Sequence, residues 1–257
     1  MEKKYIKKTI VLGIPFFTFS IITWILKTVF SNSINGQARG LIDILFFHPD
    51  GPYWYLYCLF FIFLITPTIS NKIQGIIIFG LALLGKSVII SAEGDCKLLA
   101  ISSVLTNEIW FVLGMILSLK KEKLNKIKLL YGYFGAIIFF IFSVIVFKYS
   151  IKSEWIYFLL GEIACIAVII IFSLNGIKKN RFFDFISEYT LPIYLMHTIF
   201  AATLRAILLK LGIVNGFIHI MAGISISFLG PIVVTEIMYK IKYSDFFLYP
   251  GKYIKLK

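Results

Sequence analysis

The sequence predicts an all-α fold, a polytopic bundle of about eight transmembrane helices with both termini in the cytoplasm. Of its 257 residues, 59% are hydrophobic and only 15% are charged, whereas about 25% of residues are charged in a soluble domain. Long apolar runs recur along the chain without the sustained alternation of a membrane β-strand. Lysine and arginine are concentrated in alternate connections between these runs. Together these observations exclude a disordered chain, and the three cysteines are too few for a disulfide scaffold.

The apolar runs define the expected spans, because a helix needs about 20 mostly apolar residues to cross the hydrocarbon core. The connections are short and there is no internal repeat, so we expect one membrane domain, residues 1–257. Lys27 and Lys86 lie near the predicted outer ends of their spans, where we expect their ammonium groups to snorkel to the interface. The expected spans are residues 9–30, 53–69, 73–90, 98–119, 127–147, 155–174, 191–209 and 216–239.

The basic residues orient these spans. With a cytoplasmic N-terminus, 18 of the 26 lysines and arginines fall in inner segments and 5 in outer ones, as the positive-inside rule requires. The formal net charge of +13 is therefore mostly topological, and it argues against a nucleic-acid partner. We expect a multi-pass protein of the cell membrane whose general partner is the lipid bilayer.

A few polar groups fall deep within the predicted spans, where a charged side chain costs at least ~2.5 to 3.5 kcal/mol. Glu108 and Glu162 lie well inside the fourth and sixth spans. Tyr194, His197 and Arg205 fall within an arc of roughly 80° on the seventh span, so they form one polar stripe. Arg205 pairs with Glu108 or Glu162 in one interpretation, and His197 then makes a simple interhelical hydrogen bond. In the other interpretation, His197 is a proton-transfer group.

The predicted outer loop, residues 31–52, ends in His48-Pro49-Asp50-Gly51-Pro52, in which every residue favours turns. Two interpretations are open: a turn that precedes the next span, or a histidine and an aspartate that act on an extracytoplasmic substrate. The sequence has no Gly-rich phosphate loop, and its cysteines lack metal-ligand spacing, so we expect no metal site.

Several segments in order resemble the acyltransferase 3 family, the bacterial integral-membrane O-acyltransferases that modify cell-surface polysaccharides and peptidoglycan. Residues 51–56, Gly-Pro-Tyr-Trp-Tyr-Leu, followed by Pro67, resemble its Trp-Phe-Leu segment with a later proline. Residues 187–197, which end in Ile-Tyr-Leu-Met-His, are similar to its C-terminal Ser-x-x-Ile-Tyr-Leu-x-His signature. Residues 4–17, with Gly13-Ile14-Pro15, resemble the basic stretch and Ile-Pro that open a middle helix of the family.

The resemblance implies transfer of an acyl group, in particular acetyl, from an acyl-CoA donor to a hydroxyl of a cell-surface glycan or glycolipid. The family signature includes the position of His197, and depth and chemistry suggest the remaining roles. We expect His197 to be the base, Arg205 to stabilise negative charge, and Glu108 or Glu162 to orient a partner. The candidate substrate-binding residues are Tyr194, Trp54, His48 and Asp50.

One departure from the family pattern leaves other functions open. Family members usually begin with further spans that carry an arginine and a histidine regarded as catalytic, and here no arginine or histidine precedes Arg39. We therefore expect a shortened member that lacks those helices. The alternatives are a non-catalytic membrane scaffold or sensor derived from the family, and a transporter component whose polar path is lined by Glu108, Glu162 and Arg205.

Overall fold

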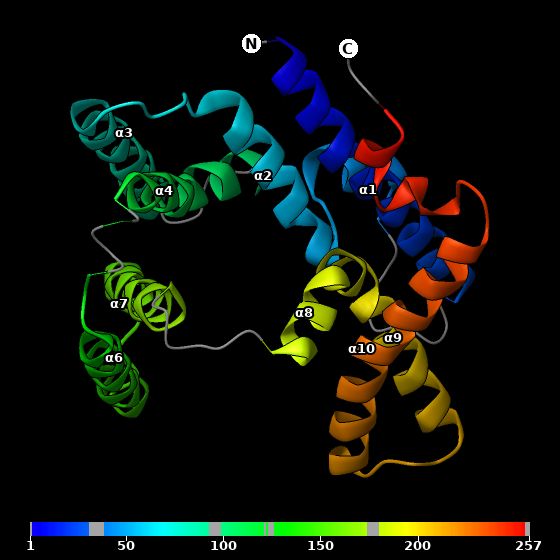
Figure 1. Ribbon diagram of the computed structural model, residues 1–257. Coiled ribbons are helices and arrows are strands. Elements are labelled where there is room, and N and C mark those ends of the chain that lie inside the picture. The colour runs from blue at the N-terminus through cyan, green and yellow to red at the C-terminus, as the bar shows by residue number, and fades with distance from the viewer. Residues whose placement is uncertain are drawn as a thin grey trace. The chain divides into compact units, whose positions relative to one another are not determined.

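The computed structural model describes residues 2–30, 39–92, 99–120, 122, 126–173 and 180–254, and every regular element in these ranges is helical (Figure 1). The chain divides into two compact units. The first unit comprises Met1–Thr68, Gly94–Glu108 and Arg181–Lys257, and the second comprises Ile69–Glu93 and Ile109–Asn180. The expected single domain and the cytoplasmic termini stay predictions.

Seven of the eight predicted spans are confirmed as helices long and apolar enough to cross a membrane. Their boundaries lie close to those of the predicted apolar runs. These helices are α1 (Glu2–Val29), α3 (Lys72–Ser91), α4 (Leu99–Leu119), α6 (Leu129–Lys148), α7 (Glu154–Ser173), α9 (Thr190–Lys210) and α10 (Gly216–Lys240).

The second predicted span, residues 53–69, is different. It contains α2 (Trp54–Ile65), a helix of 12 residues with a length of about 18 Å, against the ~30 Å of a hydrocarbon core. A 3₁₀ turn, η3 (Gly51–Tyr53), precedes it. Helix α2 ends because Thr66 stands before Pro67 and is extended, with φ −82° and ψ 115°, as is typical of a residue that precedes proline.

The first unit is built from α1, α2, part of α4, and the hairpin of α9 and α10 (Figure 1). Gly230 lets α10 approach α9, because a Cβ at this position would lie 2.5 Å from Cδ1 of Phe200. The short helix α8 (Arg181–Glu188) precedes α9. The buried core residues are Phe16, Phe19, Leu45, Tyr53, Leu56, Leu195, Met196 and Leu248.

The C-terminal residues return to α1 in two 3₁₀ turns, η4 (Ser244–Phe247) and η5 (Pro250–Lys252), so that the red end of the chain lies against the blue helix in Figure 1. Asp245 is buried and accepts hydrogen bonds from Tyr253 and from Lys252, the latter at 3.1 Å. Burial opposes ionisation of Asp245, but these hydrogen bonds outweigh it and hold the pKa of the carboxyl below its ordinary value. The ionised carboxylate therefore joins the two turns.

The second unit contains α3, the C-terminal half of α4, and the hairpin of α6 and α7. Its buried core is formed by Ile69, Ile78, Ala82, Ile109, Val112 and Phe158. Lys86 does not snorkel as expected: it is only 6% exposed, and its Nζ lies 5.0 Å from the ring centroid of Phe158. The reason is helical spacing, because Ile78, Ala82 and Lys86 lie on the same buried face of α3.

Candidate functional site

Residues 39–53 form a re-entrant segment that doubles back along α1. From Phe17 to Lys27, α1 rises about 15 Å, and this part lies within the candidate span Ile6–Val29. The predicted outer loop therefore returns to the depth of the apolar helix. The contacts are Trp24 Nε1 to Arg39 O (3.0 Å), the rings of Phe17 and Phe46 (centroids 6.3 Å apart), the ion pair of Lys27 with Asp50, and Thr23 Oγ1 to Tyr53 Oη (2.8 Å).

Side chains of neighbouring helices satisfy the irregular backbone of this re-entrant segment. The Tyr57 hydroxyl donates to Phe46 O at 2.8 Å, and the Tyr194 hydroxyl donates to Pro52 O. The Tyr53 hydroxyl in turn donates to Leu195 O at 2.9 Å. Such partners are needed because non-helical backbone at membrane depth is stable only where protein or a water-filled cavity satisfies it.

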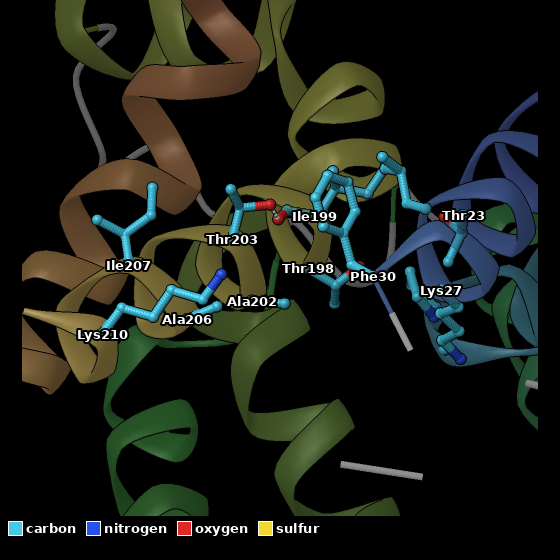
Figure 2. A pocket seen from close by; sticks show the side chains of 13 residues that line it. Thr23, Lys27, Phe30, Thr198, Ile199, Ala202, Thr203, Ala206, Ile207 and Lys210 are labelled. Atoms are coloured by element: carbon cyan, nitrogen blue, oxygen red, sulfur yellow. Dashed lines mark hydrogen bonds between the residues drawn. The ribbon is translucent and has the colours of Figure 1, made fainter. Parts of the chain in front are cut away.

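A cavity of about 370 Å³ lies within the first unit, between α1, η3 and α9. Figure 2 shows Thr23 and Lys27 from α1 on one side and a row of α9 side chains on the other, with Lys210 at the far end of the row. Most of the lining is apolar, and the exceptions are threonine hydroxyls and the two lysines. The lining residues are Thr23, Leu26, Lys27, Phe30, Gly51, Pro52, Thr198, Ile199, Ala202, Thr203, Ala206, Ile207 and Lys210.

His197 is half-buried on α9, next to the pocket-lining Thr198. Its Nδ1 lies 3.0 Å from Ile193 O and 2.9 Å from Tyr194 O. Because both partners are carbonyl oxygens, which only accept, Nδ1 carries the proton and Nε2 of the neutral ring carries the lone pair. The structure thus holds His197 in a tautomer that can accept a proton at Nε2.

Three of the predicted substrate-binding residues gather around the re-entrant segment. Asp50 pairs with Lys27 at the pocket. Tyr194 reaches Pro52 through its hydroxyl, and its ring centroid lies 6.0 Å from that of Tyr55. Trp54 packs edge-on against the same ring, that of Tyr55, with the ring centroids 6.2 Å apart. Asp50 is therefore held against the pocket-lining Lys27, and Tyr194 against the pocket-lining Pro52.

The fourth predicted substrate-binding residue, His48, has a partner that the sequence analysis did not identify. Its Nδ1 lies 2.6 Å from Oδ1 of Asp43, whereas Asp50, the aspartate two residues away, is paired with Lys27. Asp43 and His48 are five residues apart, which is the spacing of one π-helical turn. The five-residue spacing could have indicated this contact, but α-helical and β-strand periodicities do not detect it.

The remaining site predictions do not converge on the pocket. Glu108 accepts a hydrogen bond from Thr66 Oγ1 at 2.9 Å. Arg205 is exposed on α9, and in the part of the chain that the structure describes it forms no ion pair. Glu162 belongs to the second unit, where it interacts electrostatically with Lys86. The pairing of Arg205 with Glu108 is thus not observed.

The apolar helices and the re-entrant polar segment define a multi-pass helical membrane protein with a pocket beside one of its spans. The profile of the acyltransferase 3 family, described as "Acyltransferase domain", matches residues 1–236, so the chain belongs to this family. No curated protein and no solved structure matched the chain. Membership suggests a membrane acyltransferase, and the C-terminal turns η4 and η5 lie beyond the matched residues.

Proposed function

We propose that this protein is an O-acyltransferase of the cell membrane. It transfers an acyl group, in particular acetyl, from an acyl-CoA thioester to a hydroxyl of a cell-surface glycan or glycolipid. The reaction modifies a polysaccharide of the cell envelope. In this reaction the hydroxyl loses its proton, its oxygen forms an ester bond with the acyl carbon, and the carbon–sulfur bond of the thioester breaks.

The pocket between α1, η3 and α9 is the observation that carries this proposal. An acyl transfer needs a site that excludes water and places polar donors where negative charge develops. The apolar walls suit the acyl group, and Lys27 and Lys210 are cations at the lining. In this geometry Lys27 and Lys210 replace Arg205 as the proposed charge-stabilising residues, because Arg205 does not line the pocket.

His197 is one candidate proton-transfer group, because both hydrogen bonds of its side chain among the described residues use Nδ1. The pocket also bears on the transporter alternative. A path lined by Glu108, Glu162 and Arg205 is not what the pocket offers, since none of these residues lines it. The pocket therefore gives no support to a transport path lined by these residues.

Deletion of the gene and complementation test the proposal. We expect deletion to remove base-labile acyl esters from the envelope carbohydrate, and the wild-type gene to restore them. The pocket-filling Ala202→Phe should restore far fewer esters, His197→Ala tests the first candidate base, and Ile220→Phe, an exposed position on α10, is the control. An unchanged ester content on deletion would contradict the proposal and favour a scaffold or sensor. Full restoration by His197→Ala would exclude the role of that histidine alone.

A further inference from the structure

The re-entrant segment holds a carboxylate and an imidazole together by two contacts. Its π-helical turn, η2 (Asp43–Phe47), brings Asp43 under His48. The backbone N–H of His48 donates to Asp43 O at 2.7 Å, and Nδ1 lies 2.6 Å from Asp43 Oδ1. Backbone and side chain of His48 are therefore both fixed to one residue.

The turn that carries this pair is itself anchored. Ile44, which is 1% exposed, and Leu45 are buried, and Phe46 O accepts the Tyr57 hydroxyl. π-Turns are rare, and they occur often at functional sites. The packing of these apolar residues thus stabilises the π-turn, and the π-turn brings Asp43 into contact with His48.

The pair lies beside α1, a helix that is long and apolar enough to cross a membrane. His48 is between Phe46 and Asp50, which contact Phe17 and Lys27 in the span of α1. Ionisable groups within a span are by default a sign of function, and this pair is next to such a span. Both side chains are 37% exposed, so the pair is accessible from outside the protein.

The hydrogen bond sets the chemistry of the ring. An ionised carboxylate only accepts, so Nδ1 of His48 carries the proton, and Nε2 of the neutral ring carries the lone pair. A carboxylate in this position also stabilises the imidazolium that forms when Nε2 takes up a proton, as in catalytic Asp–His pairs. His197 has the same tautomer, but its partners are neutral carbonyls. Among the described histidines, only His48 faces a carboxylate, whose charge stabilises the protonated ring.

We propose that His48, in place of His197, is the general base that takes the proton from the acceptor hydroxyl, and that Asp43 is its positioning residue. The proposal rests on the acyltransferase function proposed above. The O–H bond breaks as the proton passes to Nε2, the oxygen bonds to the acyl carbon, and the electron pair of the broken carbon–sulfur bond leaves on the thiolate. The thiolate takes up a proton from solvent, and His48 returns its proton to solvent, so the step is balanced.

Isolated membranes that contain the full chain, with labelled acetyl-CoA and their own acceptors, test this proposal. The readout is label in base-labile esters. We expect His48→Ala and His48→Gln to lower transfer at least about 100-fold, which is the scale of general base catalysis. His48→Gln keeps a donor for Asp43 and so guards against a misfolded variant. Asp43→Asn should lower kcat with little change in KM. His219→Ala is the matched control, because the His219 side chain bonds only the backbone of Ile213 among the described residues.

Added imidazole separates a catalytic role from a structural one. We expect imidazole to restore part of the transfer by His48→Ala, with rescued rates that follow the basicity of a series of substituted imidazoles. Wild-type rates in the His48 variants, or a loss that no imidazole restores, would overturn this proposal and leave the acyltransferase function standing. No transfer by wild-type membranes above membranes without the protein would instead overturn the proposed function, and this proposal with it.

Discussion

The two units each place a lysine of an apolar helix against carboxylates, but in different backbone surroundings. In the first unit, Lys27 pairs with Asp50 of the re-entrant segment, and the two side chains are 32% and 19% exposed. In the second unit, Lys86 is buried over Phe158 and interacts electrostatically with Glu154 and Glu162 of the continuous helix α7. The pocket adjoins the first pair.

The comparison teaches that a charge within a span has two different uses here. Where the backbone is irregular and a pocket is next to it, the charge is available to a substrate. Where continuous helices enclose it, the charge holds helices together, because its partners are side chains of a neighbouring helix. We therefore expect Lys86 to matter for stability and Lys27 to matter for transfer.

The largest effect on stability is expected at Lys86. Among the described residues, the buried Oε1 of Glu162 has no hydrogen bond partner, and Lys86→Ala leaves this residue without the cation that offsets its charge. Lys86 and Glu162 interact electrostatically, and the about 3 to 5 kcal/mol lost when a buried pair in direct contact is broken is the upper bound for this change. We expect a lower midpoint of thermal unfolding in detergent, measured against Lys72→Ala at the exposed start of α3.

A double variant sharpens this prediction. Lys86→Met with Glu162→Gln removes both charges, and it should recover most of the stability that Lys86→Ala loses. If Lys86→Ala unfolds at the wild-type midpoint, the charge in the second unit does not hold helices together, and the contrast with the first unit fails.

The next effect compares the two helical hairpins. Gly230→Ala places a Cβ 2.5 Å from Cδ1 of Phe200 in the first unit, and Gly132→Ala places one 2.8 Å from Cγ1 of Ile171 in the second. Overpacking of this kind costs about 1 to 3 kcal/mol, so both variants should unfold earlier. Gly223→Ala is the control, because its Cβ meets nothing within 4 Å and alanine favours the helix by up to about 1 kcal/mol. Equal midpoints for all three variants would mean that neither hairpin depends on close helix contact.

The sequence predicted the long helices because their signal is local. Length and hydropathy sufficed for seven spans, and the spacing of Ile78, Ala82 and Lys86 already indicates that Lys86 is on a buried face. The position of the re-entrant segment could not be predicted in this way. It depends on contacts between residues such as Phe17 and Phe46, which are distant in sequence, and apolar composition does not show which of two apolar surfaces will meet.

The candidate site was predicted only in part, because residue chemistry is read locally whereas contacts between distant residues are not. His48, Asp50, Tyr194 and His197 were singled out from residue chemistry, and the structure places them in the first unit. Their partners were not predicted. His48 bonds Asp43 through a π-turn, and Asp50 meets Lys27 across 23 residues of chain, and neither pairing follows a helical or strand period.

A smaller effect is expected at the C-terminal turns of the first unit, which have no counterpart in the second. Asp245→Asn removes a buried carboxylate that accepts from Lys252 and Tyr253, at a cost of about 1.5 kcal/mol. Because the folded pKa of Asp245 lies below its ordinary value, its contribution is present above that ordinary value and is lost as the pH falls through the folded pKa. Hydrogen exchange of residues 241–254 should show faster opening in the variant at neutral pH. The difference should disappear in strong acid, and a difference that persists there would contradict the assigned role.

The smallest effect on stability, and the sharpest test of the contrast, is expected at Lys27. Its ion pair with Asp50 is partly exposed, so Lys27→Met should cost less than about 1 kcal/mol of unfolding free energy. Transfer by the same variant should fall at least about tenfold, because a cation is lost from the pocket wall. Lys148→Met is the matched control, since Lys148 is in the last turn of α6 as Lys27 is in the last turn of α1. Substitution of Lys86 should therefore mainly lower the midpoint of thermal unfolding, whereas substitution of Lys27 should mainly lower the transfer of labelled acetyl. If Lys27→Met unfolds early and transfers acetyl in proportion to its folded fraction, the pair of Lys27 with Asp50 serves the fold, and the division between the two units is wrong.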